Sequence, residues 1–506
     1  MVYKVQLAVH EVVRVLEEIL TAAGRGDVMP APSFVAGDWL REGRVAERTG
    51  PWLRATVTVA WQPSDDTVDV ATTAAARQAP EIARLAPAHR AAVLERAAGL
   101  ARRERERLAI VIARELGKPV SDGGKEIDRL ADTFAVCAAE ARRVGGEVLP
   151  AAGWESGVGT TAMTFRAPLG VALAITPFNA PANLLAHKLG ASFAAGNTTL
   201  VKSPPQAPAT TTAVVSLLLE AGMPAAAVQL LHGGGELGAR LCAAPEVAVI
   251  SFTGSAATGN AVARAAGAKR LVLELGGNAA TIVCDDADVT LAARTCARTG
   301  FSNSGQSCIS VQRVYVHTSV FDDFVAGMRK EVDALSVGDP SDPATDVGSM
   351  VDDAAAARVE SSIAEAVAGG ADLVCGGTRD GATLRPAVVA NPPPGATLVT
   401  EEAFGAVVVV LPFGDFDDVL EECNRSRYGL QAGLFTQRID RMFQAWRELQ
   451  VGGVIVNGSS NFRLDHVPFG GMKDSGFGRE SPAHMIEDYT TVRTLIVRGA
   501  SIHGNT

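Results

Sequence analysis

Three polar side chains that lie far apart in this chain are of the types that chemistry at a carbonyl carbon needs. Cys308 stands in the small-residue segment GFSNSGQSCIS, residues 300–310. A thiolate that attacks a carbonyl needs a hydrogen-bond donor for the oxyanion, and the acyl intermediate then needs a base that activates water. Asn179, in a turn between two prolines, suits the donor, and Glu274, at the end of an apolar run, suits the base. Together the three residues suggest covalent catalysis by Cys308.

Each of the three also has an ordinary structural explanation. The chain has seven cysteines, and most buried cysteines behave as small hydrophobic side chains. Asparagine often stabilises turns, and a carboxylate after a strand can accept hydrogen bonds from backbone N–H groups. The residues alone leave both explanations open. Because the cysteines are odd in number and include no Cys-x-x-Cys pair, we expect reduced thiols and no metal site.

Two turns that follow predicted strands have features of a dinucleotide site. Gly254 lets the backbone approach a ligand closely, and Ser255 suits the N-cap of a helix whose free N–H groups would face a phosphate. Lys202 ends another predicted strand, at the edge where open α/β sheets bind ligands. The glycine spacing is not the common G-x-G-x-x-G, so an ordinary turn and a solvated lysine explain these residues as well.

The elements that must position these residues alternate between strands and helices. From Gly170 onward, short apolar runs alternate with helical stretches, and a second such series follows Cys308. This alternation predicts an α/β fold with two doubly wound domains, each built on a parallel sheet with covering helices. One long helical stretch is expected over residues 85–116, ended by Gly117 and Pro119. We expect the following boundaries: an N-terminal extension at 1–33, a cofactor-binding domain at 34–145 and 167–274, and a catalytic domain at 275–480.

Two segments lie outside this alternation. Residues 146–166 have the pattern of a glycine-turned hairpin, and residues 489–498 that of a strand near the C-terminus. An exposed edge strand pairs with something, so we expect 146–166 and 481–506 to form a small projecting sheet for oligomerisation. An edge of a main sheet explains the pattern equally well.

The composition excludes several function classes. A formal net charge of −10 over 506 residues argues against a nucleic-acid partner. The apolar runs are far shorter than the roughly 20 residues that span a bilayer, so no membrane partner is expected. The first residues become charged too soon for a signal peptide, which predicts a cytoplasmic location. A small-molecule substrate is the expectation that is left.

Six motifs occur in a fixed order along the chain: ITPFNAPANL, FTGSAATG, LELGGN, FSNSGQSC, EEAFGAV and PFGGMKDSGFGRE. In combination they resemble the NAD(P)-dependent aldehyde dehydrogenase superfamily, and the resemblance extends from about Phe34 to Arg498. The separation of 34 positions between Glu274 and Cys308 is also that of the family.

The resemblance implies an aldehyde dehydrogenase-like fold that forms homodimers or homotetramers. It implies that Cys308 is the nucleophile, that Asn179 and the Cys308 N–H form the oxyanion hole, that Glu274 is the base and that Lys188 belongs to a proton relay. A hemithioacetal would pass hydride to the nicotinamide, and water would then hydrolyse the thioester. Implied cofactor-binding residues are Thr176, Lys202, Ser203, Pro205, Gly254, Ser255, Gly259, Leu275, Gly276, Glu402 beside the nicotinamide ribose and Phe404 beside the nicotinamide.

Two other activities stay open beside aldehyde hydrolysis to the acid. A coenzyme A-dependent acylating branch resembles this pattern but typically lacks the glutamate at position 274, which favours hydrolysis here. A catalytically idle structural relative is the second alternative. Where many members have K-P-S-E, this chain has Lys202-Ser203-Pro204-Pro205, so the carboxylate that repels a 2′-phosphate is missing and we expect both NAD and NADP to bind.

The expected substrate is a small anionic or hydroxylated aldehyde. The segments HKLG and NFRLDHVPFGG resemble the branch of lactaldehyde and phosphonoacetaldehyde dehydrogenases. Arg463, with His187 and His466, would bind an anionic tail, because a guanidinium recognises phosphonate or carboxylate in two-pronged fashion. A structural ion pair is the alternative for Arg463. The expected pocket residues are Phe178, His187, Phe301, Ser307, Ile309, Arg463 and Phe469.

Overall fold

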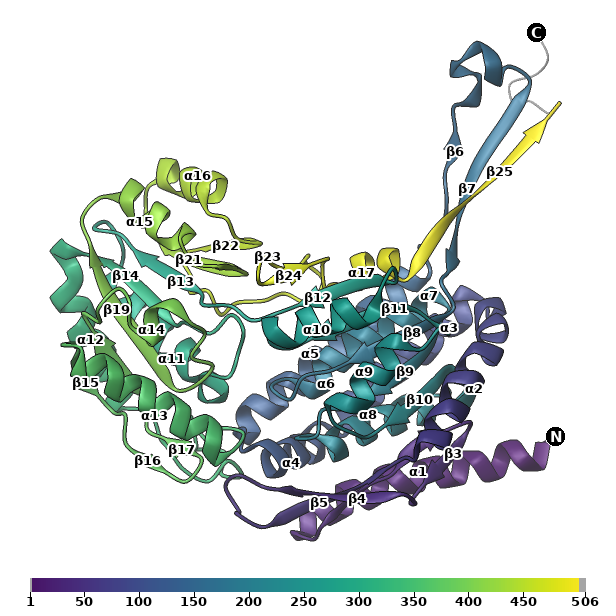
Figure 1. Ribbon diagram of the computed structural model, residues 1–506, viewed down its shortest axis with the longest axis horizontal. Helices are drawn as coiled ribbons and strands as arrows, with labels where there is room; N and C mark the ends of the chain where they lie inside the picture. The colour runs from purple at the N-terminus through teal and green to yellow at the C-terminus, as the bar shows by residue number, and fades with distance from the viewer. Residues whose placement is uncertain (1, 500–506) are drawn as a thin grey trace.

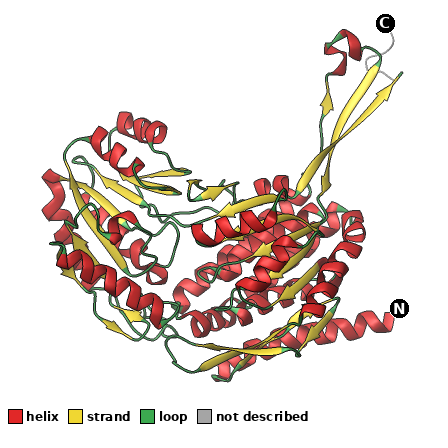
Figure 2. Ribbon diagram, in the orientation of Figure 1, coloured by secondary structure: helices red, strands yellow, loops and turns green. Residues whose placement is uncertain are grey.

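The protein is built on two parallel β-sheets covered by helices, with a third, narrow sheet that projects from the body (Figures 1 and 2). The structure is a computed structural model that describes residues 2–499. The two series of alternating strands and helices expected from the sequence are both present. This arrangement confirms the doubly wound α/β fold. No helix within the described range is long and apolar enough to cross a membrane.

The first sheet has eight strands in the order β24-β12-β11-β8-β9-β10-β2-β3. The parallel strands are β8 (Val171–Ile175), β9 (Thr198–Lys202), β10 (Val228–Leu231), β11 (Val247–Thr253) and β12 (Arg270–Glu274). Antiparallel strands complete its edges: β2 (Ser33–Val35), β3 (Asp38–Leu40) and β24 (Gly476–Phe477). The chain order reverses between β8 and β11, and such a switch point opens a crevice outside the carboxyl ends of the strands, where ligands bind.

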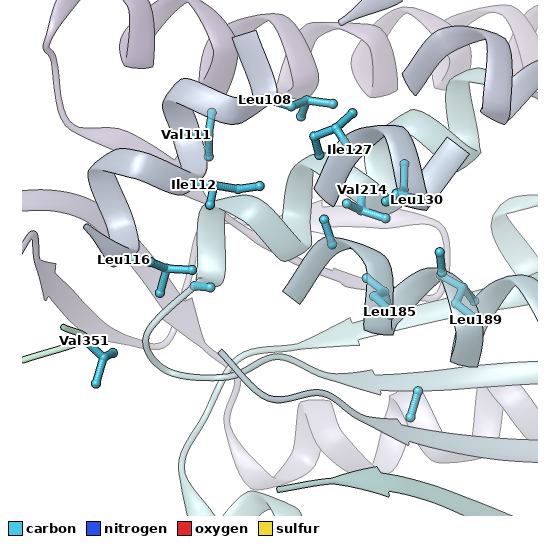
Figure 3. Close-up of a cluster of buried hydrophobic side chains, with 14 of the residues drawn as sticks. Leu108, Val111, Ile112, Leu116, Ile127, Leu130, Leu185, Leu189, Val214 and Val351 are labelled. Atoms are coloured by element: carbon cyan, nitrogen blue, oxygen red, sulfur yellow. The ribbon is translucent and has the colours of Figure 1, made fainter. Parts of the chain in front are cut away.

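Helices cover both faces of this sheet. Its connecting and covering helices are α2 (Asp65–Arg84), α3 (Pro87–Arg103), α4 (Arg105–Leu116), α5 (Val120–Ala141), α6 (Pro181–Leu185), α7 (Ala191–Ala195), α8 (Pro208–Glu220), α9 (Gly235–Ala243) and α10 (Ala256–Ala266). Side chains from α4, α5, α6 and α8 meet in a core that includes Ile112, Ile127, Leu185 and Val214 (Figure 3). Removing this apolar surface from water, at roughly 25 cal/mol per Å², holds α5 against its neighbouring helices.

The helical stretch expected over 85–116 is two helices rather than one. The break falls at Glu104, which ends α3 and begins α4. Gly117 then ends α4 with φ of 71°, as expected for a left-handed helix C-terminus. Pro119 lies just before the first residue of α5, so α4 and α5 follow each other with almost no loop.

The second sheet has seven strands in the order β15-β18-β19-β14-β13-β21-β22. Its strands are β13 (Ala280–Val283), β14 (Arg313–His317), β15 (Asp372–Cys375), β18 (Ala387–Ala390), β19 (Val407–Phe413), β21 (Gln431–Phe435) and β22 (Gly453–Val456), of which β15 alone is antiparallel. Its helices are α11 (Val289–Phe301), α12 (Phe321–Asp333), α13 (Asp353–Ala368), α14 (Thr397–Thr400), α15 (Phe416–Asn424) and α16 (Ile439–Glu448).

The projecting sheet joins segments from distant parts of the chain. It consists of β6 (Val148–Leu149), β7 (Thr160–Pro168) and β25 (Thr490–Arg498), and β25 pairs with β7 along its whole length. Figure 1 shows it leaving the body beside α17 (Pro482–Asp488). The expected projecting sheet is therefore present, and the alternative, an edge of a main sheet, is excluded.

Further elements complete the fold. They are α1 (Val2–Arg25), β1 (Met29–Ala31), β4 (Arg44–Thr49), β5 (Thr56–Gln62), β16 (Arg379–Asp380), β17 (Thr383–Leu384), β20 (Tyr428–Gly429) and β23 (Met472–Lys473). The N-terminal extension expected at 1–33 contains α1, which packs against α4 and α8. Strands β1, β4 and β5 form a separate three-stranded sheet.

Candidate active site

Cys308 lies in a loop whose backbone is tightly constrained. After α11 the chain makes a short turn, Ser302–Gly305, in which Asn303, Ser304 and Gly305 all have left-handed backbone angles, with φ of 50°, 55° and 73°. Left-handed non-glycine residues cost of order 1–3 kcal/mol each and persist only where the surroundings enforce them. The half-buried Cys308 follows, and its N–H donates to no described residue. That N–H is thus free to meet an oxyanion.

The surroundings of Cys308 hold its thiol neutral. The side chain packs against a small apolar cluster of Ile309, Leu430 and Phe469. Burial raises the pKa of the Cys308 thiol to about 12, and the negative charge of Glu402 adds to the effect. A positive charge beside the sulfur would oppose this shift and favour the nucleophilic thiolate.

Asn179 lies in the turn between β8 and α6, next to the loop of Cys308. Its carbonyl oxygen accepts hydrogen bonds from Lys118 Nζ at 3.0 Å and from Asn303 Nδ2 at 3.1 Å. Its half-buried side-chain amide hydrogen-bonds to no described residue. The backbone of Asn179 is therefore fixed while its side chain stays available as a donor.

Glu274 ends β12 and is almost fully buried. Only 2% of its surface is exposed, and neither carboxylate oxygen has a hydrogen-bond partner. Burial, and then the charge of Glu480, raises the pKa of Glu274 well above its usual range. Gly470 makes room for the carboxylate, because a Cβ there would lie 2.9 Å from Oε1. A carboxylate without backbone partners does not fit the structural explanation, whereas a raised pKa suits a general base.

Lys188 lies in a π-helical turn, Ala186–Gly190, between α6 and α7. Such turns often occur at functional sites. The fully buried ammonium donates to Glu480 Oε2 at 2.6 Å and to Thr253 Oγ1 at 2.7 Å. Burial opposes ionisation of Glu480, but Lys188 and Arg463 outweigh it and lower the pKa of that carboxyl to about 2. Glu480, which we did not predict, is thus the ionised partner of Lys188.

The sequence predicted that Arg463 binds an anion with two free prongs of its guanidinium, and this prediction is wrong. Its Nη1 already donates to Glu480 Oε1, and its Nη2 donates to the Glu480 carbonyl and to His187 Nε2, each at 3.1 Å. Its guanidinium carbon lies 4.1 Å from the ring centre of Phe469. The ion-pair alternative is therefore present. Arg463 places a positive charge near Cys308, but both of its terminal nitrogens are already hydrogen-bonded within the protein.

The two histidines expected beside Arg463 are separated. His187 is fully buried, with Nε2 3.0 Å from Asp465 Oδ1, and burial lowers its pKa. Arg129 holds Asp465 with two hydrogen bonds of 2.9 and 2.7 Å. His466 is exposed, and no hydrogen bond joins it to the described residues of this network. His187 therefore orients Arg463, and His466 is not placed to share an anion with it.

Phe301 is the clearest correction among the expected pocket residues. It is the last residue of α11, only 1% exposed, and belongs to the main hydrophobic core. Ile309 and Phe469 do lie beside Cys308, and Ser307 is half-buried in the same loop. Phe178 meets Phe404 edge to face at 5.9 Å. These four residues, without Phe301, stay as candidates for the pocket wall.

The switch point between β8 and β11 carries several of the expected cofactor residues. Thr176, after β8, has a buried hydroxyl without a partner. Ser255, after Gly254, caps α10 by accepting a hydrogen bond from the Thr258 N–H. Gly259 lies in the first turn of α10 against Leu275, where a Cβ would overlap the leucine side chain. An orphaned polar group and a capped helix N-terminus at this crevice fit a pyrophosphate.

Lys202 and Ser203 follow β9 but face different surroundings. Lys202 is mostly buried, its ammonium hydrogen-bonds to no described residue, and burial lowers its pKa to about 8. The Ser203 hydroxyl instead lies 2.7 Å from His232 Nδ1 inside the protein, so its expected cofactor contact is corrected. Pro205 is exposed beside them. The Lys202 ammonium is therefore the group here that is available to hydrogen-bond with a ribose or a phosphate.

Glu402 follows α14, a helix of the second sheet, and lies against the loop after β12. Its Oε1 accepts a hydrogen bond from the Gly277 N–H at 2.9 Å, and a Cβ on Gly276 would overlap Oε2. Burial raises the pKa of Glu402 to about 7. The neighbouring Phe404 has a left-handed φ of 47°. The absence of a side chain at Gly276 therefore leaves room for this carboxylate beside the end of β12.

The chain is similar to known proteins along most of its length. Residues 39–495 match the model of the Aldehyde dehydrogenase family. The chain is 40% identical over 412 residues to the 3-sulfolactaldehyde dehydrogenase of Priestia aryabhattai. The aligned residues cover 81% of this chain and 86% of that protein. The lactaldehyde dehydrogenase of Methanococcus vannielii is 35% identical over 418 residues, 82% of this chain and 88% of that one.

A solved structure is similar over the same range. The NADP-dependent glyceraldehyde-3-phosphate dehydrogenase of Bacillus halodurans, solved with NADP, superposes with a TM-score of 0.90 at 32% identity. The superposition covers 93% of this chain and 100% of that chain. The range matched by the family model contains every residue of the site described above.

Proposed function

The chain belongs to the aldehyde dehydrogenase family and is an NAD(P)-dependent enzyme, and from that premise we propose that it oxidises a small anionic aldehyde to the carboxylic acid through a thioester on Cys308. The observation that carries the proposal is Glu274, a buried carboxylate without a partner beside a cysteine. Such a group suits activation of water, which supports hydrolysis over transfer to coenzyme A.

The residues of the chain divide the chemistry between them. Deprotonated Glu274 takes the thiol proton, and Cys308 Sγ attacks the aldehyde carbon. The Asn179 side chain and the Cys308 N–H stabilise the oxygen that becomes charged. When bound, the oxidised nicotinamide supplies the hydride acceptor and a positive charge beside the sulfur. Glu274 passes the thiol proton to solvent with the help of the Lys188–Glu480 pair beside it, then takes a proton from the water that attacks the thioester and releases it by the same route.

The residues that would hold the dinucleotide come from both sheets. Lys202 and Thr176 offer polar groups without described partners, and the α10 N-terminus offers free N–H groups. Glu402 would accept hydrogen bonds from the ribose next to the nicotinamide. Because Pro205 stands where a carboxylate would repel a 2′-phosphate, both NAD and NADP should serve.

We infer the anionic character of the substrate from one cation near Cys308 and from two similar proteins. Arg463 lies beside Phe469, which packs against Cys308, and its charge lowers the pKa of that thiol. The relative from Priestia aryabhattai acts on a sulfonated aldehyde and the solved neighbour on a phosphorylated one. In both, the anionic group is close to the aldehyde. We therefore infer a sulfonate, phosphonate or carboxylate near the aldehyde, with a hydroxyl as an accepted neighbour.

We further propose that the projecting sheet pairs with a second copy of the chain in a homodimer or homotetramer. One edge of β25 has no partner strand within the described residues, and the strand exposes Val492, Leu495 and Ile496. Exposed apolar edge strands are rarely left unpaired. The domain boundaries expected from the sequence stay part of the same proposal.

The proposal is tested by NAD(P)H formation at 340 nm. Sulfoacetaldehyde, 3-sulfolactaldehyde, lactaldehyde and hexanal are compared with NAD and with NADP, with and without coenzyme A. We expect the anionic aldehydes to give the highest kcat/KM, no dependence on coenzyme A, and no turnover by Cys308→Ala. Faster oxidation of hexanal than of every anionic aldehyde would refute the substrate class, and full activity of Cys308→Ala would refute the mechanism.

A further inference from the structure

We propose that Lys118, Asp122 and Glu126, at the start of α5, form a clamp that positions Asn179 against Cys308. These are positioning residues, because none of them reaches the reacting atoms. The inference rests on the proposed function, since it assigns to the clamp the alignment of the oxyanion donor with the nucleophile. Nothing in the sequence motifs pointed to it.

One half of the clamp holds the turn that carries Asn179. Lys118 is 6% exposed, and its Nζ donates to Glu126 Oε2 at 2.7 Å and to the Asn179 carbonyl at 3.0 Å. Glu126 Oε1 accepts hydrogen bonds from the Ala182 N–H at 2.8 Å and the Asn183 N–H at 3.3 Å. The buried ion pair therefore fixes the turn at its carbonyl and at the first turn of α6.

The other half holds the loop that carries Cys308. Asp122 Oδ2 accepts a hydrogen bond from the Asn303 N–H and another from Ser302 Oγ, each at 2.9 Å. Asp122 and Glu126 are four residues apart in α5, so they lie on one face of the helix. Asn303 Nδ2 then donates to the Asn179 carbonyl at 3.1 Å, which joins the two halves.

The clamp connects the loop of Asn179 to the loop of Cys308, a connection that pairing between the two sheets does not provide. Asn179 follows β8 of the first sheet, whereas Cys308 follows α11, which covers the second sheet. No strand of one sheet pairs with a strand of the other among the described residues, so strand pairing does not set the relative position of the two loops. A misplacement of about 1 Å between reacting groups can cost about 10²-fold in rate. The left-handed angles of Asn303 and Ser304 show that this loop is held away from its relaxed conformation.

The Lys118 half is tested with the double variant Lys118→Met/Glu126→Gln. The single change Lys118→Met would leave a buried carboxylate unpaired, which by itself endangers folding. In the double variant no buried charge is left alone, and the glutamine oxygen still accepts from Ala182 and Asn183. We expect a melting temperature near that of the wild type, an unchanged Kd for NAD and NADP, and a kcat lowered about 10- to 100-fold.

The Asp122 half is tested by a matched series. Asp122→Asn keeps an oxygen that accepts from Asn303 and Ser302, whereas Asp122→Ala removes it, so the asparagine variant should retain several-fold more kcat than the alanine variant. Lys125 pairs with Asp122 Oδ1 at 2.9 Å from an exposed position. Lys125→Ala breaks that ion pair without touching either loop and should leave kcat unchanged.

A second readout separates this inference from the proposed function. Hydrolysis of p-nitrophenyl acetate needs Cys308 and an oxyanion donor but no hydride transfer, and the clamp variants should slow it as much as they slow aldehyde oxidation. A wild type that cleaves the ester but oxidises no aldehyde would refute the proposed function alone. Lys118→Met/Glu126→Gln with ester and aldehyde kcat within twofold of wild type would overturn the clamp, as would a loss of melting temperature with unchanged kcat.

Discussion

Replacing Lys188 by methionine should destabilise the protein by about 3 kcal/mol. The Lys188–Glu480 contact of 2.6 Å corresponds to an attraction of about 6 kcal/mol at an effective dielectric constant of about 20, before desolvation is subtracted. Removing one partner of a buried pair costs about 3–5 kcal/mol, because the other charge is left unpaired. Arg463 still holds Glu480 at 3.1 Å, which places the loss at the lower end.

The expected loss converts into a measurable shift of the melting temperature. An unfolding entropy of about 2.1 cal/mol/K per residue over 506 residues gives about 1 kcal/mol per degree, so Tm should fall by about 3 °C. The Tm of Lys188→Met/Glu480→Gln should fall further, because this variant also removes the carboxylate partner of the buried Arg463. Differential scanning calorimetry at pH 7 measures both. A Tm drop below 1 °C for Lys188→Met, or an equal drop for both variants, would refute the reasoning.

The sign of the pH dependence follows from the lowered pKa of Glu480. A carboxyl whose pKa is about 2 when folded stabilises the protein above its unfolded pKa, near 4.5, and loses this contribution as the pH falls toward 2. The difference between Lys188→Met and wild type should therefore be constant from pH 6 to 8 and shrink in acid. Persistence of the full difference at pH 3 would contradict the assignment.

Four further predictions follow from single contacts. Glu274→Gln cannot take a proton, so kcat in the 340 nm assay should fall about 10²- to 10⁴-fold, and iodoacetamide should alkylate Cys308 more slowly than in the wild type. Because burial raises the pKa of Glu274, and Glu274 must be deprotonated to take the thiol proton of Cys308, kcat/KM should rise from pH 6 to pH 9, and a flat profile would contradict this. Lys202 loses its charge as the pH rises through about 8, so fluorescence titration should show weaker NADP binding above that pH and a smaller change for NAD. Gly276→Ala should displace Glu402 and raise the KM of both cofactors, and unchanged values would show that the glycine is dispensable.

The sequence predicted the two sheets because their strands are buried on both faces and therefore appear as continuous apolar runs. The strands β8 to β12 and the later series from β13 fall where those runs lie. It did not predict the break at Glu104, since no glycine or proline marks it. Glu104 is 6% exposed and forms ion pairs with Arg103 and Arg107.

The sequence predicted those residues of the candidate site whose types have few other uses. The prediction failed where burial decides what a side chain contacts. Cys308, Glu274 and Asn179 stood out because a carbonyl mechanism needs these groups. Phe301 was placed in the pocket by its nearness in sequence to Cys308, but the last turn of α11 directs it into the core. The role of Lys118 was not predicted, because its position in the sequence suggests an exposed side chain. A lysine before a helix usually faces solvent, and only the packing of α5 shows that this one is buried.

Glu274 and Glu480 show how one site gives two carboxylates opposite properties. Both are buried, yet the pKa of Glu480 is lowered to about 2 and that of Glu274 is raised. The difference lies in their partners, because Lys188 and Arg463 both hydrogen-bond to Glu480 and neither bonds to Glu274. Two carboxyl groups whose environments separate their pKa values are the usual basis for an acid–base assignment. The buried cations therefore have a chemical consequence beyond stability: by neutralising Glu480 they leave Glu274 without a counter-ion, and so keep its proton affinity high enough to accept a proton from water.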